Sequence, residues 1–367
     1  MRAMGQSIRD LDEPSAGPKA ASGISFLKRV LEPPSYGWEQ RPSNAQMWRE
    51  LASRVNIFAS RKNWLGFTNW FWTLALAPFI VLFFAYYFSW WGLVVGFLYS
   101  MVGMGTYGTI WLHRYGTHKA FTFSHPVWRF VTRNLVIKVV PEEIYIISHL
   151  VHHAVPEKPG DPYNATFGGL YCFLADSLHQ PIAQDLSREE YARAVGFVEH
   201  TGIIVNSYEQ YQRWGSIAHP VWMTAAFAFN WLFWYAAFYL IGGHALAVTI
   251  FGSAHIWAVG IRTFNFAGHG GGEDKRVEGV DFNRRDLSIN QYWPGYVAGE
   301  WHNNHHLYPN SARAGFLWWQ FDLAWVYIKT LSRLGMVSSY HDHRPRFLAR
   351  HWQPYVEAKK AAASSAE

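Results

Sequence analysis

The sequence predicts an all-α integral membrane protein with four transmembrane helices, arranged as two helical hairpins joined to a polar helical cap. Two observations carry this prediction. Residues 63–112 and 215–261 contain no Asp, Glu, Lys or Arg, and charge-free runs of this length are rare in the buried helices of soluble proteins. The chain also contains 20 Trp and 20 Tyr, whose amphipathic rings favour the membrane–water interface.

Each uncharged stretch is too long for one membrane crossing. Residues 63–112 would extend about 75 Å as a helix, whereas the hydrocarbon core of a bilayer is about 30 Å thick. We therefore expect a helical hairpin in each stretch, turning near Ser89 in the first and at Gly242 and Gly243 in the second. The four expected spans are 67–88, 91–112, 219–241 and 244–264.

Basic residues flank the expected spans, but the two turns carry none. The positive-inside rule therefore places both termini and the cap on the cytoplasmic side. The expected parts of the chain are a polar N-terminal tail with short interfacial helices at 1–62, a membrane domain at 63–340 with its cap at 113–214 and 265–340, and a C-terminal tail at 341–367. The flanking basic residues are Arg49, Arg54, Arg61, Lys62, Arg114, Lys119, Arg213, Arg262 and Lys275.

Two segments of the cap have recognisable helix patterns. Ser187 and Glu190 have the spacing of a capping box, which predicts a helix that begins after Ser187. Residues 318–334 are amphipathic and rich in Trp, which predicts a helix lying along the membrane surface. Residues 113–214 contain charges throughout, so we expect no crossing there.

Histidines gather in three short motifs beside the spans: His-x4-His at 113–118, and His-x2-His-His at 149–153 and again at 302–306. An Asn-x3-His element follows the last span at 265–269. Because an even number of crossings separates these motifs, all of them lie on the cytoplasmic side. The candidate metal ligands and catalytic residues are His113, His118, His149, His152, His153, Asn265, His269, His302, His305 and His306.

The spacing within the motifs supports convergence on one site. The 149–153 and 302–306 motifs place their histidines at i, i+3 and i+4, on one face of a helix. His113 and His118 are about 140° apart on an ideal helix. They share a face only if the helix ends or bends, which Gly116 permits.

The other histidines are interpreted as ordinary hydrogen-bonded polar residues. His255 lies within the fourth expected span, where an ionisable residue is a functional candidate, but it precedes Asn265 by about three helical turns. His244 falls in an outer turn. The remaining members of this group are His125, His179, His200, His219, His341, His343 and His351.

Nine imidazoles are enough ligands for two metal ions. Iron, copper and zinc all accept imidazole, but zinc takes about four ligands, often with Cys, and the only Cys here is Cys172. Iron is preferred because a site with open positions at a membrane edge suits reaction with O2. The single Cys also excludes an intrachain disulfide framework and an Fe–S cluster. A net charge of +6 without a recognised binding motif argues against nucleic acid as a partner.

This set of motifs resembles the membrane fatty acid desaturase superfamily, and the run from Gly299 to His306 is most similar to acyl-CoA desaturases. The resemblance covers about residues 68–335. It implies a four-span, mushroom-like helical fold in which two iron ions (Fe2+/Fe3+) are held by the nine histidines and by Asn265, directly or through water. It also implies that O2 is a co-substrate and that hydrogen is abstracted from an unactivated C–H bond of a fatty acyl chain.

The resemblance also implies an electron donor. No haem, flavin or Cys-cluster motif accompanies the histidines, so the electrons must come from a separate ferredoxin or cytochrome with its reductase. The expected partners are this donor protein, the fatty acyl substrate and membrane lipid.

The chain departs from the acyl-CoA desaturase pattern in two places. Glu142 and Glu143 precede the second histidine motif, and residues 158–163 read Lys-Pro-Gly-Asp-Pro-Tyr after it. Arg262 lies one helical turn before Asn265. It is either a helix-end side chain that extends to the membrane surface, or a cation near the metal ions that binds a free carboxylate of the substrate.

Desaturation of a fatty acyl chain is the favoured activity. Two alternatives share the hydrogen-abstraction step, namely oxidative decarboxylation of free fatty acids to terminal alkenes, and hydroxylation. A non-enzymatic alternative is a membrane metal-binding protein, although carriers usually place ligands along a transport path and these ligands gather on one side. The sequence leaves open the acyl chain length, the position of attack, and whether the acyl group is carried by CoA, ACP, lipid or none.

Overall fold

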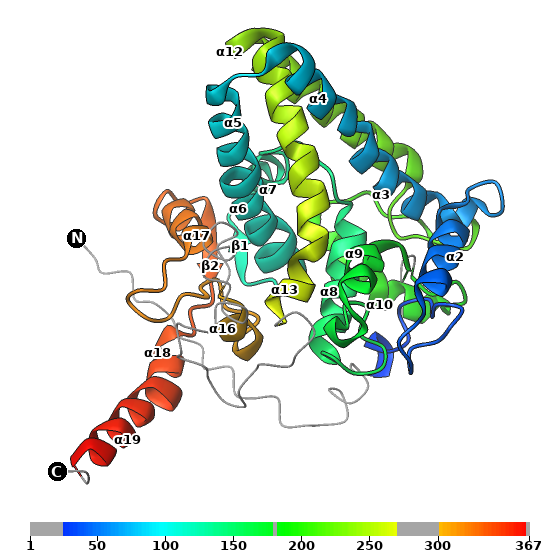
Figure 1. Cartoon of the computed structure of the whole chain (residues 1–367). Coiled ribbons are helices and arrows are strands. Elements are labelled where there is room, and N and C mark those ends of the chain that lie inside the picture. Colours follow the sequence, from blue (N-terminus) through cyan, green and yellow to red (C-terminus); the bar gives the residue numbers. More distant parts are fainter. Residues whose placement is uncertain (1–24, 179–181, 270–300, 365–367) are drawn as a thin grey trace.

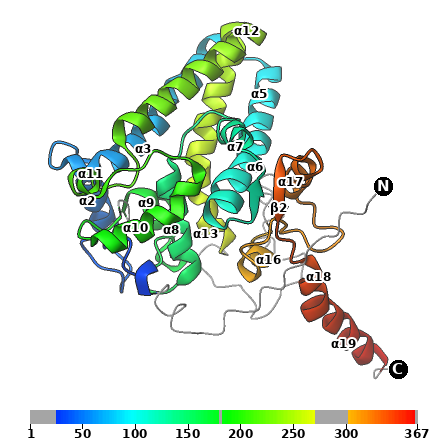
Figure 2. The ribbon, with the colours of Figure 1, turned by 180° about the vertical axis from the view of Figure 1, so that it is seen from behind.

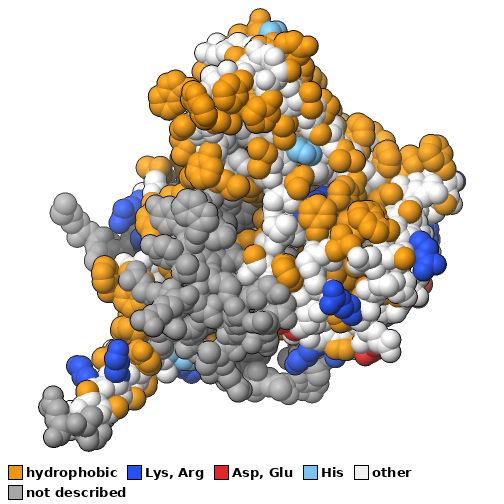
Figure 3. Space-filling view, in the orientation of Figure 1, with side chains coloured by type: hydrophobic (Ala, Val, Ile, Leu, Met, Phe, Trp, Pro, Cys, Tyr) orange, Lys and Arg blue, Asp and Glu red, His pale blue; other side chains and the backbone are white. Residues whose placement is uncertain are grey.

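The protein is mostly helical, in two parts. The structure is a computed structural model that describes residues 25–178, 182–269 and 301–364. Long apolar helices form a bundle at one end of the molecule, and shorter helices form a cap at the other (Figure 1). Apolar side chains cover much of the visible face of the bundle, whereas the visible Lys and Arg side chains gather around the cap (Figure 3).

The helices are divided between the bundle and the cap, and two short strands accompany them. The bundle contains η1 (Arg61–Asn63), α3 (Trp64–Ala75), α4 (Ala77–Leu82), η2 (Phe83–Tyr87), α5 (Trp90–Phe97), η3 (Leu98–Met104), α6 (Gly105–Tyr107), η4 (Gly108–Thr117), α12 (Pro220–Gly260), η7 (Ile261–Thr263) and α13 (Phe264–Gly268). The helices of the cap are α2 (Asn44–Val55), α7 (Pro126–Arg133), α8 (Glu142–Ala154), η5 (Ala165–Phe167), α9 (Gly169–Leu178), α10 (Arg188–Val198), η6 (Glu199–Thr201), α11 (Tyr208–Trp214), α16 (His302–Leu307), α17 (Leu323–Arg333), α18 (Arg344–Phe347), η9 (Leu348–Trp352) and α19 (Gln353–Ser364). The strands are β1 (Phe121–Phe123) and β2 (Val337–Tyr340).

Within the described residues, three apolar helical stretches are long enough to cross a membrane, which indicates a multi-pass membrane protein. They are Arg61–Tyr87, Trp90–Thr117 and Pro220–Gly268. The third stretch is interrupted where Gly242 and Gly243 leave helical geometry, and Gly243 has a φ of 66° that favours glycine. The two halves of α12 meet at this turn and diverge from it towards the cap (Figures 1 and 2), so the chain reverses at the turn that the sequence predicts.

The first hairpin also turns where the sequence predicts. Ser89 is the N-cap of α5, and its hydroxyl accepts a hydrogen bond from the backbone N–H of Gly92 at 3.0 Å. This contact satisfies one of the donors that every helix N-terminus leaves unpaired. Pro78, in the first turn of α4, starts a second helical segment after Ala75 without needing an amide donor.

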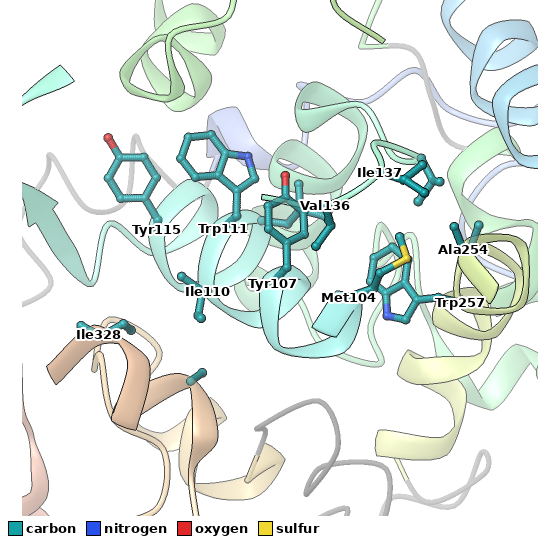
Figure 4. Close-up of a cluster of buried hydrophobic side chains, with 14 of the residues drawn as sticks. Met104, Tyr107, Ile110, Trp111, Tyr115, Val136, Ile137, Ala254, Trp257 and Ile328 are labelled. Atoms are coloured by element: carbon teal, nitrogen blue, oxygen red, sulfur yellow. The ribbon is translucent and has the colours of Figure 1, made fainter. Parts of the chain in front are cut away.

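Aromatic and aliphatic side chains hold the bundle together. Met104 lies beside Trp257 and Ala254 of α12 (Figure 4), and Tyr107 and Trp111 belong to the same buried cluster, the largest among the described residues. Helices approach closely where glycine removes a side chain. At Gly108, for example, an added Cβ would lie 2.9 Å from Cζ2 of Trp257. The buried face of this helix therefore leads from the membrane bundle directly into the first histidine motif.

Buried carboxylates join the cap to the bundle at the start of α8. Glu143 accepts hydrogen bonds from the backbone N–H groups of Ile217 and Ala218, both at 2.8 Å, just before α12 begins. Burial raises the pKa of Glu143 to about 7, although these two donors lower it. Its neighbour Glu142 pairs with Arg133 at 2.6 Å. Both acids also lie in the first helical turn, where the helix dipole favours negative charge.

The prediction of an all-α protein is wrong in one respect. β1 and β2 form an antiparallel pair in which Phe121 faces Tyr340, and β2 lies beside α17 (Figure 2). This pair ties the residues after the first histidine motif to the C-terminal part of the chain. Strands of three and four residues are too short to show a pattern of alternation that sequence reading can distinguish from a loop.

Both helices predicted in the cap are present, but one of them begins later than predicted. The capping box of Ser187 and Glu190 is present and α10 follows it. The predicted helix over 318–334 begins only at Leu323, because the side chain of Asp322 accepts the Trp325 N–H at 2.8 Å and acts as the N-cap.

The sequence analysis counts Arg114 among the basic residues that mark the cytoplasmic side. The structure shows that it is not a surface charge. It is fully buried and forms an ion pair with Asp322, with Nη1 and Oδ1 3.0 Å apart. Nη1 of Arg114 also donates to the carbonyl of Ala312 at 2.7 Å. The pair connects the helix of the first histidine motif to the segment that follows the third motif.

We expect Asp322→Asn to lower the free energy of unfolding by about 3 kcal/mol, because it leaves the buried Arg114 guanidinium without its counter-ion. Denaturant unfolding in detergent micelles measures the change. Asp185→Asn is the control, because its ion pair with Arg29 is exposed and is worth about 1 kcal/mol or less. Equal losses in the two variants would contradict the structural role of the buried pair.

Candidate metal centre

The first histidine motif lies on a π-helical segment. In η4 the backbone N–H of His118 donates to the carbonyl of His113 at 3.1 Å, five residues earlier. This wider turn brings the two rings to 5.0 Å between centroids. Gly116 allows α8 to approach, because an added Cβ would lie 2.8 Å from Cδ1 of Ile146. The sequence predicts that His113 and His118 share a face only if the helix ends or bends, and the π-helical turn provides this change of geometry.

Five histidines from three motifs converge on one group. One ring nitrogen from each lies within 4.8 Å of the others. Nε2 of His113 lies 2.8 Å from Nε2 of His305 and 3.0 Å from that of His149. The five residues are His113, His118, His149, His153 and His305.

A second group lies next to the first. His152, His269 and His306 bring their ring nitrogens within 4.8 Å of one another. His302 joins this group, since its Nε2 lies 2.8 Å from Nε2 of His269 and 3.1 Å from that of His306. The rings of His153 and His306 are 4.4 Å apart between centroids, so the two groups are contiguous. All nine predicted histidines therefore meet in one place.

Asn265 is the tenth predicted ligand. It is buried on α13, one turn before His269, and the His269 N–H donates to its carbonyl at 3.1 Å. Its side-chain oxygen Oδ1 has no hydrogen-bond partner among the described residues. This leaves a buried acceptor beside the second histidine group.

Carboxylates behind the rings set their orientation. Asp161 accepts a hydrogen bond from Nδ1 of His152 at 2.9 Å, and it is itself held by the backbone N–H groups of Glu157 and Tyr163, both at 2.8 Å. Oε1 of Glu157 contacts Nδ1 of His269. A carboxylate behind Nδ1 makes that nitrogen the proton carrier, so Nε2 turns its lone pair towards the centre.

Sequence reasoning noted this loop only as a departure and missed both carboxylates. Glu157 has a φ of 52°, which is uncommon for a residue other than glycine. The available signal was the acidic residue of the Pro-Gly-Asp-Pro segment immediately after the second motif.

Burial favours the neutral form of several of these rings. Burial, and then the neighbouring imidazoles, lower the pKa of His149, His153, His305 and His306 well below the usual value for histidine. Neutral imidazole carries one N–H and one lone pair. Nitrogen atoms that converge at 2.8–3.1 Å therefore cannot all hydrogen-bond to one another, and the excess of lone pairs facing inward fits positively charged metal ions.

Several histidines outside the motifs are hydrogen-bonded polar residues, as predicted. His255 pairs with the carbonyl of Thr73 at 2.7 Å, and His244 with the hydroxyl of Tyr235 at 2.9 Å. Similar contacts are made by His125, His200, His343 and His351. His179 lies outside the described residues.

Arg262 does not extend to the surface. Only 5% of it is exposed, its guanidinium lies over the ring of Trp70 at 4.3 Å, and its Nη2 donates to Oγ1 of Thr73 at 3.4 Å. Of its two interpretations, the snorkelling side chain is therefore wrong.

We expect Asp161→Asn to weaken metal binding roughly 10- to 100-fold. Only one of the two polar side-chain atoms of Asn is a hydrogen-bond acceptor. The amide therefore cannot replace the carboxylate, which accepts from His152 and from two backbone N–H groups. Metal content after dialysis against graded chelator measures this. Asp342→Asn, at a cap on the C-terminal segment, should leave the metal affinity unchanged. Unaltered retention in the Asp161 variant would rule out the orienting role.

The chain is similar in sequence to proteins of known activity. The model of the family described as fatty acid desaturase matches residues 88–344. The chain is 28% identical over 279 residues to icosanoyl-CoA 5-desaturase of Limnanthes douglasii, covering 72% of this chain and 67% of that protein. It is 26% identical over 276 residues to hex-5-enoyl-[acyl-carrier protein] acetylenase of Moorena producens, covering 67% and 75%.

Over a shorter region, the sequence identity to a known protein is higher. Over 86 residues the chain is 40% identical to sn-1 stearoyl-lipid 9-desaturase of Synechocystis, covering 22% of this chain and 27% of that protein. The family match extends from the first hairpin, through all of the histidine motifs, to the C-terminal segment. The chain belongs to the fatty acid desaturase family.

Proposed function

We propose that the two histidine groups hold a pair of iron ions at the membrane edge and that this centre desaturates a fatty acyl chain. The family match makes the protein a fatty acid desaturase. The observation that supports two ions is the pair of contiguous histidine groups. The proposed ligands are His113, His118, His149, His152, His153, His269, His302, His305 and His306, with Asn265 as the tenth.

The protein's own residues prepare the centre. Iron, when bound, supplies activation of O2 and removal of hydrogen from an unactivated C–H bond, which no side chain can do. Burial keeps the imidazoles neutral, so they are ligands without prior loss of a proton. Asp161 and Glu157 hold the rings of His152 and His269 in one orientation. Each new double bond consumes one O2, two electrons and two protons and releases two waters, so an external ferredoxin or cytochrome with its reductase is required.

The proposed topology has four crossings, with both halves of α12 spanning the bilayer. The reversal at Gly242 and Gly243 supports it, as do the outward-facing Leu232 and Leu240 on the first half of α12. In this topology both termini and the cap, at 113–214 and 265–340, face the cytoplasm. The tails at 1–62 and 341–367 flank the membrane domain.

The bundle also contains an apolar cavity near the turn of the first hairpin, towards the end of the bundle away from the histidine groups. Its volume is about 380 Å³, and it lies between the first hairpin and the second half of α12. Leu93, Phe97 and Ile256 are among its lining side chains. An apolar cavity of this kind suits an acyl chain rather than a polar metabolite.

We expect the iron-loaded protein, given O2, an electron donor and saturated acyl substrates, to form products of equal chain length with one added double bond. Mass spectrometry of the products measures this. A hydroxy acid as the sole product would contradict desaturation, and so would unconsumed O2 with two irons bound. The second of these results would favour a metal-binding protein without catalysis.

We expect His149→Ala to lower the iron content below two per chain and to abolish product formation, because His149 contributes to the buried five-histidine group. His255→Ala is the matched control. It removes a partly buried histidine whose partner is a backbone carbonyl, so the iron content should not change. Loss of iron in both variants would indicate general misfolding rather than loss of a ligand.

A further inference from the structure

We propose that residues 126–141 form a re-entrant membrane element, in which α7 lies in the leaflet next to the cap and presents an apolar face to lipid acyl chains. The inference rests on the proposed topology, in which both hairpin turns lie at the membrane surface away from the cap. It goes beyond that topology, because this segment follows the second crossing and enters the membrane without crossing it.

Side chains of the spanning helices bond the tip of this element, residues 134–138. The hydroxyl of Tyr99, on η3, accepts a hydrogen bond from the backbone N–H of Ile137 at 3.0 Å. The indole N–H of Trp234, on the first half of α12, donates to the carbonyl of Asn134 at 3.0 Å. The tip therefore lies between the second crossing and the third.

Asn230 holds the tip from the same half of α12. Its Oδ1 accepts from the backbone N–H of Lys138 at 2.9 Å, and its Nδ2 donates to the carbonyl of Val136 at 3.1 Å. The backbone at the tip is not helical, and such backbone is tolerated at membrane depth only where protein groups satisfy its hydrogen bonds. Asn230 is itself buried, so it meets this requirement within the bundle.

The positions of these side chains along their helices limit the depth of the tip. Tyr99 lies nine residues after Trp90, where α5 begins, and Asn230 lies twelve residues before Gly242. These positions are no more than about 14 and 18 Å from the two turns, and the hydrocarbon core is about 30 Å thick. Tilting of the helices shortens these depths. Trp90 and Trp91 are exposed at the first turn, as aromatic residues at a membrane surface are.

α7 leads into this tip with two different faces, and it lies beside α6, farther from the cap than α8 (Figures 1 and 2). Val127, Phe130 and Val131 are 50%, 63% and 44% exposed, and their i, i+3, i+4 spacing places them on one face. On the opposite face, Nη1 of Arg129 donates to the carbonyl of His200 at 3.1 Å. The basic face is thus bound to the cap, and the apolar face fits the hydrocarbon around the bundle.

The charges within the element are paired. Nζ of Lys138, which is buried, lies 3.3 Å from Oε1 of Glu142, and Nε of Arg133 lies 2.6 Å from the same oxygen. Ionisable residues at membrane depth are expected to be paired in this way. Because α8 begins at Glu142 and carries the second histidine motif, the element holds that part of the metal centre at the membrane edge.

Fluorescence quenching at single engineered cysteines tests the lipid contact. Phe130→Cys, Leu232→Cys and Glu189→Cys are labelled with a nitrobenzoxadiazole dye in the full-length protein in nanodiscs. The natural Cys172 is buried, so dye-treated wild type gives the background. We expect the Phe130 label to lose fluorescence with phospholipids that carry a mid-chain nitroxide, as the label at the exposed bundle residue Leu232 does, and to keep it with aqueous iodide. The label at Glu189, exposed on α10, should respond in the opposite way.

The two agents and the two reference labels decide between the outcomes. Quenching of the Phe130 label by iodide overturns the inference, and so does quenching by neither agent, which would mean that protein covers this face. If the Leu232 label is quenched by lipid and the Phe130 label is not, the element fails and the four crossings stand. If lipid quenches neither label, the proposed third crossing fails with it. Val131→Cys replaces Phe130→Cys if that variant does not fold.

Asn230→Leu tests how the tip is held. It leaves two backbone groups of the tip without their partners, which is costly in hydrocarbon. We therefore expect the Phe130 label to become accessible to iodide in this variant, while the Leu232 label stays inaccessible. Thr249→Val is the matched control, because the hydroxyl of Thr249 donates to the carbonyl of Ala245 within its own helix. Unchanged quenching in Asn230→Leu contradicts the support of the tip by the spanning helices.

Discussion

The structure depends on one constraint, which is that nine imidazoles, six of them buried and three partly buried, must be held with their ring nitrogens facing one another. Nitrogen atoms 2.8–3.1 Å apart leave no room for water between them, and inward lone pairs without a positive charge repel. The rest of the fold supplies the restraint. The buried pair of Arg114 and Asp322 ties the first motif to the segment after the third, and Asp161 holds the second motif from behind. Binding of the proposed metal ions would therefore be coupled to folding, because the histidines come from elements far apart in the chain.

Helix geometry then determines which side chains can reach the centre. An α-helix would direct His113 and His118 about 140° apart, and the π-helical turns of η4 remove this mismatch at the membrane edge. π-helical turns are rare and occur mostly as short insertions in α-helices, so the contacts around this one are informative. Here the contacts come from α8, which approaches at Gly116, and from the Trp111 and Tyr115 rings of the same segment. A side chain at position 116 would separate the first motif from the second.

Much of this architecture was predictable from local patterns. The uncharged stretches, the turns at Ser89 and Gly243, and the capping box at Ser187 are short-range signals, and all of them hold. The convergence of the histidines was predictable because i, i+3 and i+4 spacing places side chains on one face of a helix. What could not be read depends on contacts distant in sequence. The Arg114–Asp322 pair joins residues 208 positions apart, and Glu157 acts through a strained backbone conformation that no residue-type pattern specifies.

Two buried asparagines differ from the histidines, because they lack hydrogen-bond partners for some of their side-chain atoms among the described residues. Asn69 and Asn265 each bury side-chain atoms without partners among the described residues, and each costs stability where an apolar side chain would not. A core selected for stability alone would replace them. Asn265 precedes His269 by four residues on the same helical segment, which places its unpaired Oδ1 next to the proposed metal centre rather than in a purely structural contact. The same reasoning separates them from His255, whose ring is already satisfied by a backbone carbonyl.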